Sequence, residues 1–379
     1  MKTTSAPILM RSDALNVLKY QITSFIGSLD HVQEHHLVSI PFPALTTDGF
    51  FQKTTRIRLS QAFDAQPHPC LSVRSSLKQL WEAKLTQNPH IFDADKFRLS
   101  HWFVEGEDNN KKLVICMGMT SYRAYVSTCC SEYTSKLISD GLQLESPLPC
   151  NMTMQDTSAY AQSGRYLSRK IGVSGILETL DNHLVLIRRS ESSNVYPNLL
   201  DTPGGHPEPQ RIGIDSHTLE KINWEKTDAS YDHKKEEEAV GELFHSVLDE
   251  IHEEINLDRH HLSPPKLLGI VHQGEALTPS FGTSDCASKW TDVTFEQAFF
   301  VKCLQHSEEV VKAYEMGPQD AFESNQLVLL EPPSKANGSS RANLNAHQLV
   351  ATRSIDCNLM NELTPCACAA VAFWRTRYK

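Results

Sequence analysis

Three glutamates near the middle of the chain have the residue type and the spacing for metal-dependent chemistry. Glu250, Glu253 and Glu254 lie in the stretch LDEIHEEINL. Side chains three and four positions apart share one face of a helix, so the three carboxylates would stand together there. Crowded carboxylates repel one another unless a positive charge lies among them, and oxygen ligands at this spacing suit Mg²⁺ or Mn²⁺. The pattern predicts a catalytic metal site in which Glu250 and Glu254, one turn apart, are the ligands.

The helix that carries these glutamates is predicted from apolar residues that recur every fourth position. Such a stripe faces a core, and the carboxylates beside it are expected at the core's edge rather than in bulk water. Asn256 follows, and asparagine tolerates the left-handed conformation that closes many helices. Glutamates at this spacing are also common on solvated helices, so the metal site needs support from elsewhere. The apolar stripe is Leu243, Val247, Ile251 and Ile255.

A second stretch, LLDTPGGHPEP at residues 199–209, supplies that support. A short apolar run ends in the pair Gly204-Gly205, and His206 and Glu208 follow at once. A glycine pair lets the backbone approach a ligand closely. We expect this loop to face the helix that carries the glutamates.

Together the two stretches resemble the Nudix box. That box reads Gly, five residues, Glu, seven residues, and then Arg-Glu-apolar-x-Glu-Glu-x-Gly-apolar. Gly205 matches its opening, and Glu250, Glu253 and Glu254 match its second half. In the wider family the carboxylate that takes the proton varies, so Glu253 is either a third ligand through water or the general base.

The sequence departs from the box at three points. Asp249 stands where the box has arginine, and Asn256 stands where it has glycine. Arginine would orient the neighbouring carboxylates, whereas aspartate is expected to repel them. The distance in sequence from Gly205 to Glu250 is also far longer than in the box. We therefore interpret residues 210–236, which are polar, as an insertion that forms a surface loop.

Further stretches resemble one branch of the family, the UDP-glucose/UDP-galactose diphosphatases, and this resemblance covers residues 76–379. It implies an α+β protein, with a Nudix-type α/β/α sandwich around a mixed sheet and a smaller N-terminal α+β module. It also implies Mg²⁺-dependent hydrolysis of UDP-glucose or UDP-galactose to UMP and sugar 1-phosphate, with Mn²⁺ as a possible substitute. The stretches are GGHPEP, IFDADKFRL at 91–99, MTSYR at 119–123 and LIRRS at 186–190.

The resemblance implies eight substrate-binding positions. The Arg189 guanidinium would bind a phosphate through two parallel N–H groups. Asp201 would either accept a hydrogen bond from a sugar hydroxyl or cap the turn before the glycine pair. Phe92 and Tyr122 would sandwich a uracil, although an aromatic residue in IFD is usually part of a core. The complete set is Phe92, Tyr122, Arg189, Asn194, Asp201, His206, Glu208 and Cys366.

The 379 residues are ample for a large core, and we divide the chain into three parts. Residues 1–75 are predicted to be a partly ordered extension, where prolines interrupt every pattern. Residues 76–167 are predicted to form the N-terminal substrate-binding module. Residues 168–379 are predicted to form the Nudix hydrolase domain with its insertion.

Composition excludes several other roles. Lys and Arg total 36 against 46 Asp and Glu, and a net charge of −10 argues against a sequence-independent hold on nucleic acid. No apolar run approaches the ~20 residues that span a bilayer, so we expect no membrane partner. The ten cysteines form no Cys-x-x-Cys repeat, which favours reduced thiols in the cytoplasm. The basic start of the chain leaves organelle targeting open. The expected partner is a small nucleotide sugar, and no pattern indicates the oligomeric state.

Two other functions stay open. One is a Nudix hydrolase of another diphosphate, such as ADP-ribose or a coenzyme A derivative. The other is a catalytically inactive Nudix-fold module that binds nucleotides, which would fit the departure at Asp249. The three retained glutamates favour an enzyme, because a binding module has no need to crowd carboxylates.

Periodicity and turn residues predict the secondary structure. The last helix should begin with Thr364 as its cap and Pro365 in its first turn. Helices are expected near 77–85, 124–138 and 308–315, and strands at 96–105, 111–122, 171–180, 183–189, 199–202, 266–273, 293–303 and 326–331.

Overall fold

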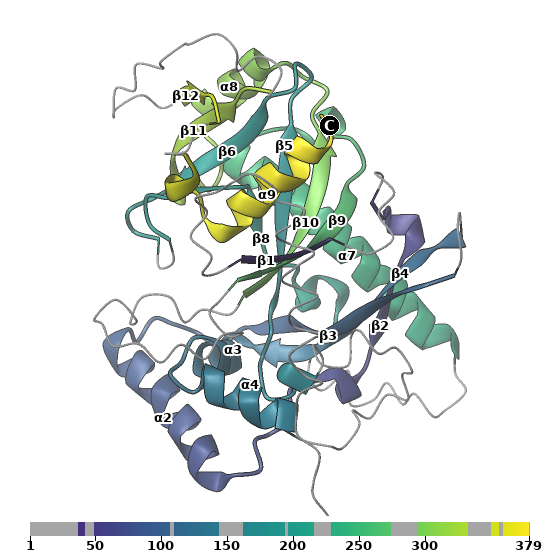
Figure 1. Ribbon diagram of the computed structural model, residues 1–379, viewed down its shortest axis with the longest axis vertical. Helices are drawn as coiled ribbons and strands as arrows, with labels where there is room; N and C mark the ends of the chain where they lie inside the picture. Colours follow the sequence, from purple (N-terminus) through teal and green to yellow (C-terminus); the bar gives the residue numbers. More distant parts are fainter. Residues whose placement is uncertain are drawn as a thin grey trace, which may run out of the picture.

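The strands of the protein form two sheets that lie in separate halves of the molecule (Figure 1). The larger sheet has nine strands and the smaller has three among the residues that the structure describes. This computed structural model describes residues 37–41, 49–106, 110–143, 162–193, 196–215, 229–273, 294–332, 350–355 and 359–378.

The larger sheet is mixed. Its strand order is β1-β9-β10-β5-β6-β11-β12, with β7 added to β6 and β8 added to β5. β10 runs parallel to β5 and β11 runs parallel to β12, whereas the other pairs are antiparallel. The strands are β1 (Leu37–Pro41), β5 (Ile171–Glu178), β6 (Leu184–Arg189), β7 (Leu200–Asp201), β8 (Gly204–Gly205), β9 (Lys266–Gln273), β10 (Thr294–Lys302), β11 (Ser324–Leu330) and β12 (Val350–Arg353).

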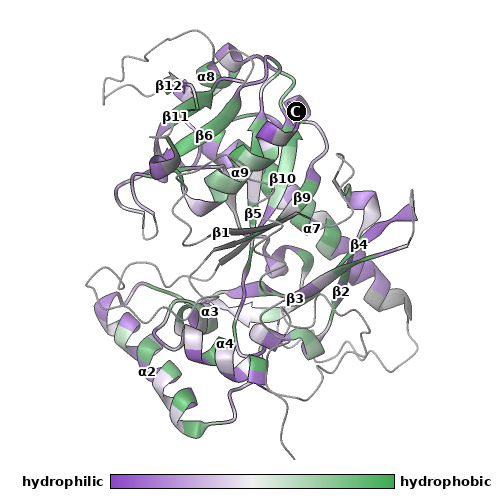
Figure 2. Cartoon of the chain, in the orientation of Figure 1, coloured by the Kyte–Doolittle hydropathy of each residue, from purple (hydrophilic) through white to green (hydrophobic). Residues whose placement is uncertain are grey.

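Two helices cover the opposite faces of this sheet. α7 (Ala229–Ile255) packs its apolar stripe on one face with Val173 and Phe299, and α9 (Pro365–Thr376) covers the other face with Ile176 and Phe300. Hydrophobic residues make up most of β6 and much of α9 (Figure 2). The predicted α/β/α sandwich with a mixed sheet is confirmed.

The smaller sheet has the order β2-β4-β3. β3 (Asp95–Glu105) and β4 (Lys112–Ser121) form the predicted hairpin, and β2 (Thr55–Leu59) lies parallel to β4. The remaining helices of the protein are α2 (Leu71–Gln87), α3 (Tyr122–Cys129), α4 (Thr134–Gln143) and α8 (Ser307–Glu315), with 3-10 turns η1 (Gln52–Thr54), η2 (Gln61–Phe63), η4 (Pro209–Ile212), η5 (Arg259–His261) and η7 (Leu359–Glu362).

The two sheets are joined by α7 and by the chain before β5. Leu59 of β2 donates its main-chain N–H to the Glu236 carboxylate at 3.2 Å, while the other end of α7 packs on β5. Arg98 of β3 forms an isolated bridge with Lys170, next to β5. One apolar cluster runs through both halves, so the module and the sandwich share a core.

Local sequence patterns predicted the ends of several helices and strands correctly. Asn256 has a φ of 65° just after α7, as expected of a left-handed helix end. The Thr364 hydroxyl accepts from the main-chain N–H of Ala367, with Pro365 in the first turn of α9, as predicted. Asn182, in the turn between β5 and β6, has a φ of 67°.

Several predicted boundaries are wrong. β1 and β2, which lie within the segment 1–75 that was predicted to be a partly ordered extension, pair into the two sheets. TRIRL in β2 alternates buried and exposed residues, which is the pattern of a half-buried strand. The predicted helix 124–138 is two helices, because Thr134 bonds back to Thr128 and Ser131.

The predicted insertion also ends in helix rather than in a loop. α7 begins at Ala229, and Lys234 and Lys235 both pair with Glu238 on its first turns. Charged pairs three and four apart stabilise a helix, so the charged run extends α7 instead of preceding it. Residues 216–228 of the insertion lie outside the described residues.

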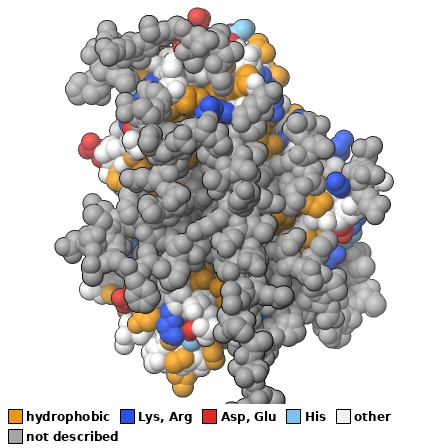
Figure 3. Space-filling view, viewed as in Figure 1, with side chains coloured by type: hydrophobic (Ala, Val, Ile, Leu, Met, Phe, Trp, Pro, Cys, Tyr) orange, Lys and Arg blue, Asp and Glu red, His pale blue; other side chains and the backbone are white. Residues whose placement is uncertain are grey.

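No helix within the described ranges is both long enough and apolar enough to cross a membrane. On the face drawn in Figure 3, the Lys and Arg side chains of the described residues are interspersed with acidic and hydrophobic ones.

Candidate active site

The glycine pair lies against the helix that carries the glutamates. Gly204 donates its main-chain N–H to Glu254 Oε2 at 2.8 Å, and the N–H of His206 bonds the Glu250 carboxylate. A Cβ at Gly205 would lie 2.7 Å from Glu250 Oε2 and closer still to Oε1. Glycine is therefore the residue that lets the Glu250 carboxylate lie directly on the backbone of β8.

Both carboxylates are held where their negative charge is unfavourable. Glu254 is 3% exposed, and its burial, together with the Glu250 carboxylate, raises its pKa well above the ordinary value. Burial, followed by repulsion from Glu253 and Glu323, raises the pKa of Glu250 to about 7. A cation between the two side chains would relieve both effects.

Asp249 does not add to this repulsion, and the prediction that it would is wrong. Its carboxylate pairs with Arg211 Nη1 at 2.7 Å and with the guanidinium of Arg259. Both arginines come from 3-10 turns outside α7. Asp249 is therefore neutralised beside the glutamates.

Two more carboxylates come from the loop between α8 and β11, and the sequence analysis missed them. Asp320 donates its main-chain N–H to the carbonyl of Glu253 at 2.9 Å, which fixes the loop against the end of α7. Partial desolvation and the Asp320 carboxylate raise the pKa of Glu323, and the nearby Arg189 opposes that rise. Single acidic residues in a loop carry no spacing signal, so only the fold could place them here.

Arg189 and Asp201, two of the predicted substrate-binding residues, lie together. Asp201 accepts from Arg189 Nη1 at 3.2 Å and from the Thr364 hydroxyl at 2.6 Å. Burial raises the pKa of Asp201 although Arg189 and Thr364 act against it. Asp201 also lies close enough to Glu254 to raise its pKa, so this pair adjoins the glutamates.

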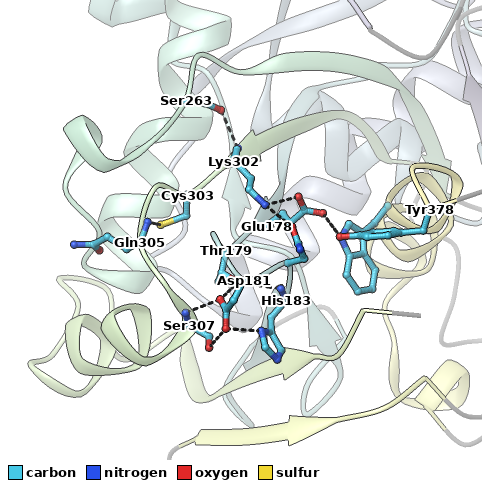
Figure 4. A network of polar contacts seen from close by, with 12 residues as sticks. Glu178, Thr179, Asp181, His183, Ser263, Lys302, Cys303, Gln305, Ser307 and Tyr378 are labelled. Atoms are coloured by element: carbon cyan, nitrogen blue, oxygen red, sulfur yellow. Dashed lines mark hydrogen bonds and ion pairs between the residues drawn. The ribbon is translucent and has the colours of Figure 1, made fainter. Parts of the chain in front are cut away.

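The far end of α9 is fixed by another buried carboxylate. Glu178 of β5 accepts from Lys302 Nζ at 2.7 Å and from the Tyr378 hydroxyl at 2.8 Å (Figure 4). It also accepts from Trp374 Nε1 at 2.6 Å. Together with the bond from Thr364 to Asp201, this network holds α9 at both ends. The helix therefore positions the Asp201 side of the site.

His206 contacts the ammonium group of Lys170 through Nε2. Burial, followed by the charges of Lys170 and Lys96, lowers the pKa of His206 well below its ordinary value, so the imidazole is neutral. Because an ammonium can only donate, Nε2 accepts and the ring proton lies on Nδ1. Lys170 Nζ also lies 4.5 Å from the ring centre of Tyr125, which links the loop to the N-terminal module.

The other predicted binding residues are spread more widely. The Glu208 side chain is exposed and lies 3.5 Å from Arg211 Nε, while Cys366 is buried at the start of α9. Phe92 is 76% exposed, whereas Tyr122 packs on Trp81 with ring centres 6.3 Å apart. Asn194 lies outside the described residues.

The arrangement fits Mg²⁺ bound together with a substrate. Within the described residues, no three His, Cys, Asp or Glu side chains converge as a closed metal cage. Mg²⁺ usually takes only one or two carboxylates, and waters and substrate phosphates complete its shell. Glu250 and Glu254 supply two such carboxylates. Other acidic side chains nearby contribute to the raised pKa of each.

Comparison with known proteins gives the family. No protein-family model matches the chain. The mouse (Mus musculus) protein named uridine diphosphate glucose pyrophosphatase NUDT22 is 32% identical over 287 residues, which are 75% of this chain and 78% of that protein. Nudix hydrolase 9 of Arabidopsis thaliana is 27% identical over 283 residues, 74% of this chain and 78% of that protein.

A solved structure, the MutT protein from Methanosarcina mazei Go1, is 18% identical over 36% of this chain and 70% of its own, with a TM-score of 0.18. The fold described above is established by its own strand order and helix layers. A carboxylate-bearing helix against a glycine loop, in an α/β/α sandwich, defines a hydrolase of the Nudix type. The sequence relatives show that the chain belongs to the Nudix hydrolase family, whose members cleave pyrophosphate bonds. It is an enzyme, and the alternative of an inactive binding module is set aside.

Proposed function

We propose that the protein hydrolyses UDP-glucose or UDP-galactose to UMP and sugar 1-phosphate, with Mg²⁺ held by Glu250 and Glu254. The observation that carries this proposal is the pairing of these two carboxylates with the main-chain N–H groups of His206 and Gly204. The pairing holds both carboxylates beside the glycine pair of β8. The name of the mouse relative supports the choice of UDP-glucose.

Water would attack one phosphorus atom, form a new P–O bond and break the bridging P–O bond of the diphosphate. Bound Mg²⁺ would neutralise phosphate charge and lower the pKa of the attacking water. Glu253, half-buried on the same helix face, takes the proton or supports the metal through a water. The leaving phosphate carries away the electron pair of the broken bond.

The residues around the glutamates suit the rest of the substrate. Arg189, which donates to Asp201 at 3.2 Å, would direct its guanidinium charge toward a phosphate of the substrate. The neutral His206 would donate from Nδ1, because its Nε2 accepts from Lys170. We further propose that the module at residues 76–167 reads the base.

A panel of diphosphates tests this function. Metal-stripped protein is incubated with UDP-glucose, UDP-galactose, ADP-glucose, ADP-ribose and a coenzyme A derivative, with and without Mg²⁺. Phosphorus NMR identifies the products. We expect UMP and sugar 1-phosphate from the two UDP-sugars, and only with Mg²⁺. Faster turnover of ADP-ribose or of coenzyme A would overturn the substrate assignment.

A further inference from the structure

A carboxylate that lies beside the predicted substrate-binding residues, Glu296, has no role in the chemistry proposed so far. Glu296 lies on β10 opposite Gly172 of β5. A Cβ at Gly172 would lie 2.8 Å from Glu296 Cγ, so glycine there leaves the space that this side chain occupies. The pairing places Glu296 one strand from Gly172 and two strands from the glycine pair of β8.

Glu296 departs from the pattern of its own strand. By strand alternation it shares a face with Ala298 and Phe300, which are buried in the apolar cluster beneath α9. A residue kept for stability on such a face would be apolar, because a carboxylate loses hydration there. Glu296 itself is half-buried, so its carboxylate lies at the margin of this apolar face, beside other polar side chains.

Three of its neighbours are predicted substrate-binding residues. The Glu296 carboxylate bonds the side chain of Cys366 and lies near Asp201, Arg189 and Lys170. Burial, and then the Asp201 carboxylate, raises its pKa to about 7. Two carboxylates and two cations thus meet where β10, β5 and the start of α9 converge.

We propose that Glu296 is a specificity-determining residue, which accepts a hydrogen bond from a sugar hydroxyl of the bound nucleotide sugar. The inference rests on the proposed function. Two strand spacings separate β8 from β10, about 10 Å, and the Glu296 side chain together with a sugar ring attached to the diphosphate can span this separation. Carboxylate oxygens are strong acceptors for such hydroxyls.

The donor is the ribose 2′-hydroxyl or the hexose 2- or 6-hydroxyl, and three analogues separate these sources. 2′-Deoxy-UDP-glucose lacks the first, UDP-2-deoxyglucose lacks the second, and UDP-xylose lacks the hydroxymethyl group. Each is measured with UDP-glucose on the parental protein and on Glu296→Gln. Removing the charged acceptor should lower kcat/KM for UDP-glucose about 10- to 100-fold.

The diagnostic result is non-additivity. The analogue that lacks the partner hydroxyl should lose kcat/KM with the parental protein and should lose no more with Glu296→Gln. Gly172→Ala, whose Cβ displaces Glu296, should reproduce this result if Glu296→Gln fails to fold. Glu331→Gln is the matched control. Its carboxylate, just after β11, accepts from the Ser354 hydroxyl at 2.7 Å, so this variant should lower the unfolding midpoint without changing selectivity.

Additive losses with all three analogues would overturn the role of Glu296 while leaving the proposed function intact. Absence of UDP-glucose turnover by the parental protein would overturn the proposed function and this inference together.

Discussion

Replacing Gly205 with alanine should disable the enzyme without unfolding it. The new Cβ would lie 2.7 Å from Glu250 Oε2 and closer to Oε1, whereas ordinary contacts begin near 3.4 Å. The main chain tolerates alanine, because Gly205 is not among the described glycines with positive φ. The carboxylate must therefore retreat by about 1 Å, and a displacement of that size costs up to about 10²-fold in rate.

The assay compares UDP-glucose turnover and Mn²⁺ affinity in the parental protein, Gly205→Ala and Gly241→Ala. Gly241 lies on α7, the helix that carries Glu250. A Cβ added there would meet only Gln52 Nε2, at 3.8 Å. This control should keep its activity and gain about 0.5–1 kcal/mol of stability from improved helix propensity.

Gly205→Ala should lose about 10²-fold in kcat/KM and should bind Mn²⁺ more weakly, with an unfolding midpoint close to the parental one. Parental turnover by Gly205→Ala would refute the placement of Glu250 in the active site. A large drop in its midpoint would instead mean that the glycine is needed for packing.

Three further predictions follow from individual contacts. Burial lowers the pKa of His101 to about 4 from the ordinary 6.5, so the unfolded chain binds more protons between these values and stability falls as pH drops through that window. His101→Phe should remove up to roughly 3 kcal/mol of this dependence in urea unfolding from pH 7 to pH 4, and an unchanged slope would contradict it. Thr364→Val removes the cap of α9 and the 2.6 Å bond to Asp201. The free energy of unfolding should therefore fall by about 1–2 kcal/mol, and KM for UDP-glucose should rise. No change in either quantity would exclude Thr364 as a residue that positions Asp201. Phe92→Ala removes a ring that is 76% exposed, so stability should hold while KM for UDP-glucose rises about fivefold or more through lost stacking. An unchanged KM would leave base recognition to other residues, with Tyr122 tested next.

The sequence predicted those features that depend on residues close together in the chain. The helix of the three glutamates, its end at Asn256 and the cap at Thr364 all follow from spacing or from local backbone preference. The family resemblance then joined the glycine pair to that helix across the long intervening segment. These are the elements around which the proposed active site is built.

What could not be predicted depends on segments brought together by folding. Asp249 pairs with Arg211 and Arg259, one on each side of it in sequence, and no local rule links the three. Glu296 resembles any glutamate in a strand until the register places it opposite Gly172. Asp320 is likewise an ordinary loop residue until its N–H bonds the end of α7.

Metal binding and turnover in three neighbouring variants test the central claim most directly. Metal-stripped Glu250→Gln, Glu254→Gln and Asp249→Asn are titrated with Mn²⁺ by electron paramagnetic resonance, and their UDP-glucose hydrolysis is measured in Mg²⁺. We expect both glutamate variants to lose at least about 10²-fold in turnover, with weaker Mn²⁺ binding. The turnover and Mn²⁺ affinity of Asp249→Asn should stay within a few-fold of the parental values. Its carboxylate is paired with Arg211 and Arg259, so we do not expect it to be a metal ligand. Parental metal affinity and turnover in Glu254→Gln would contradict the assignment of the active site.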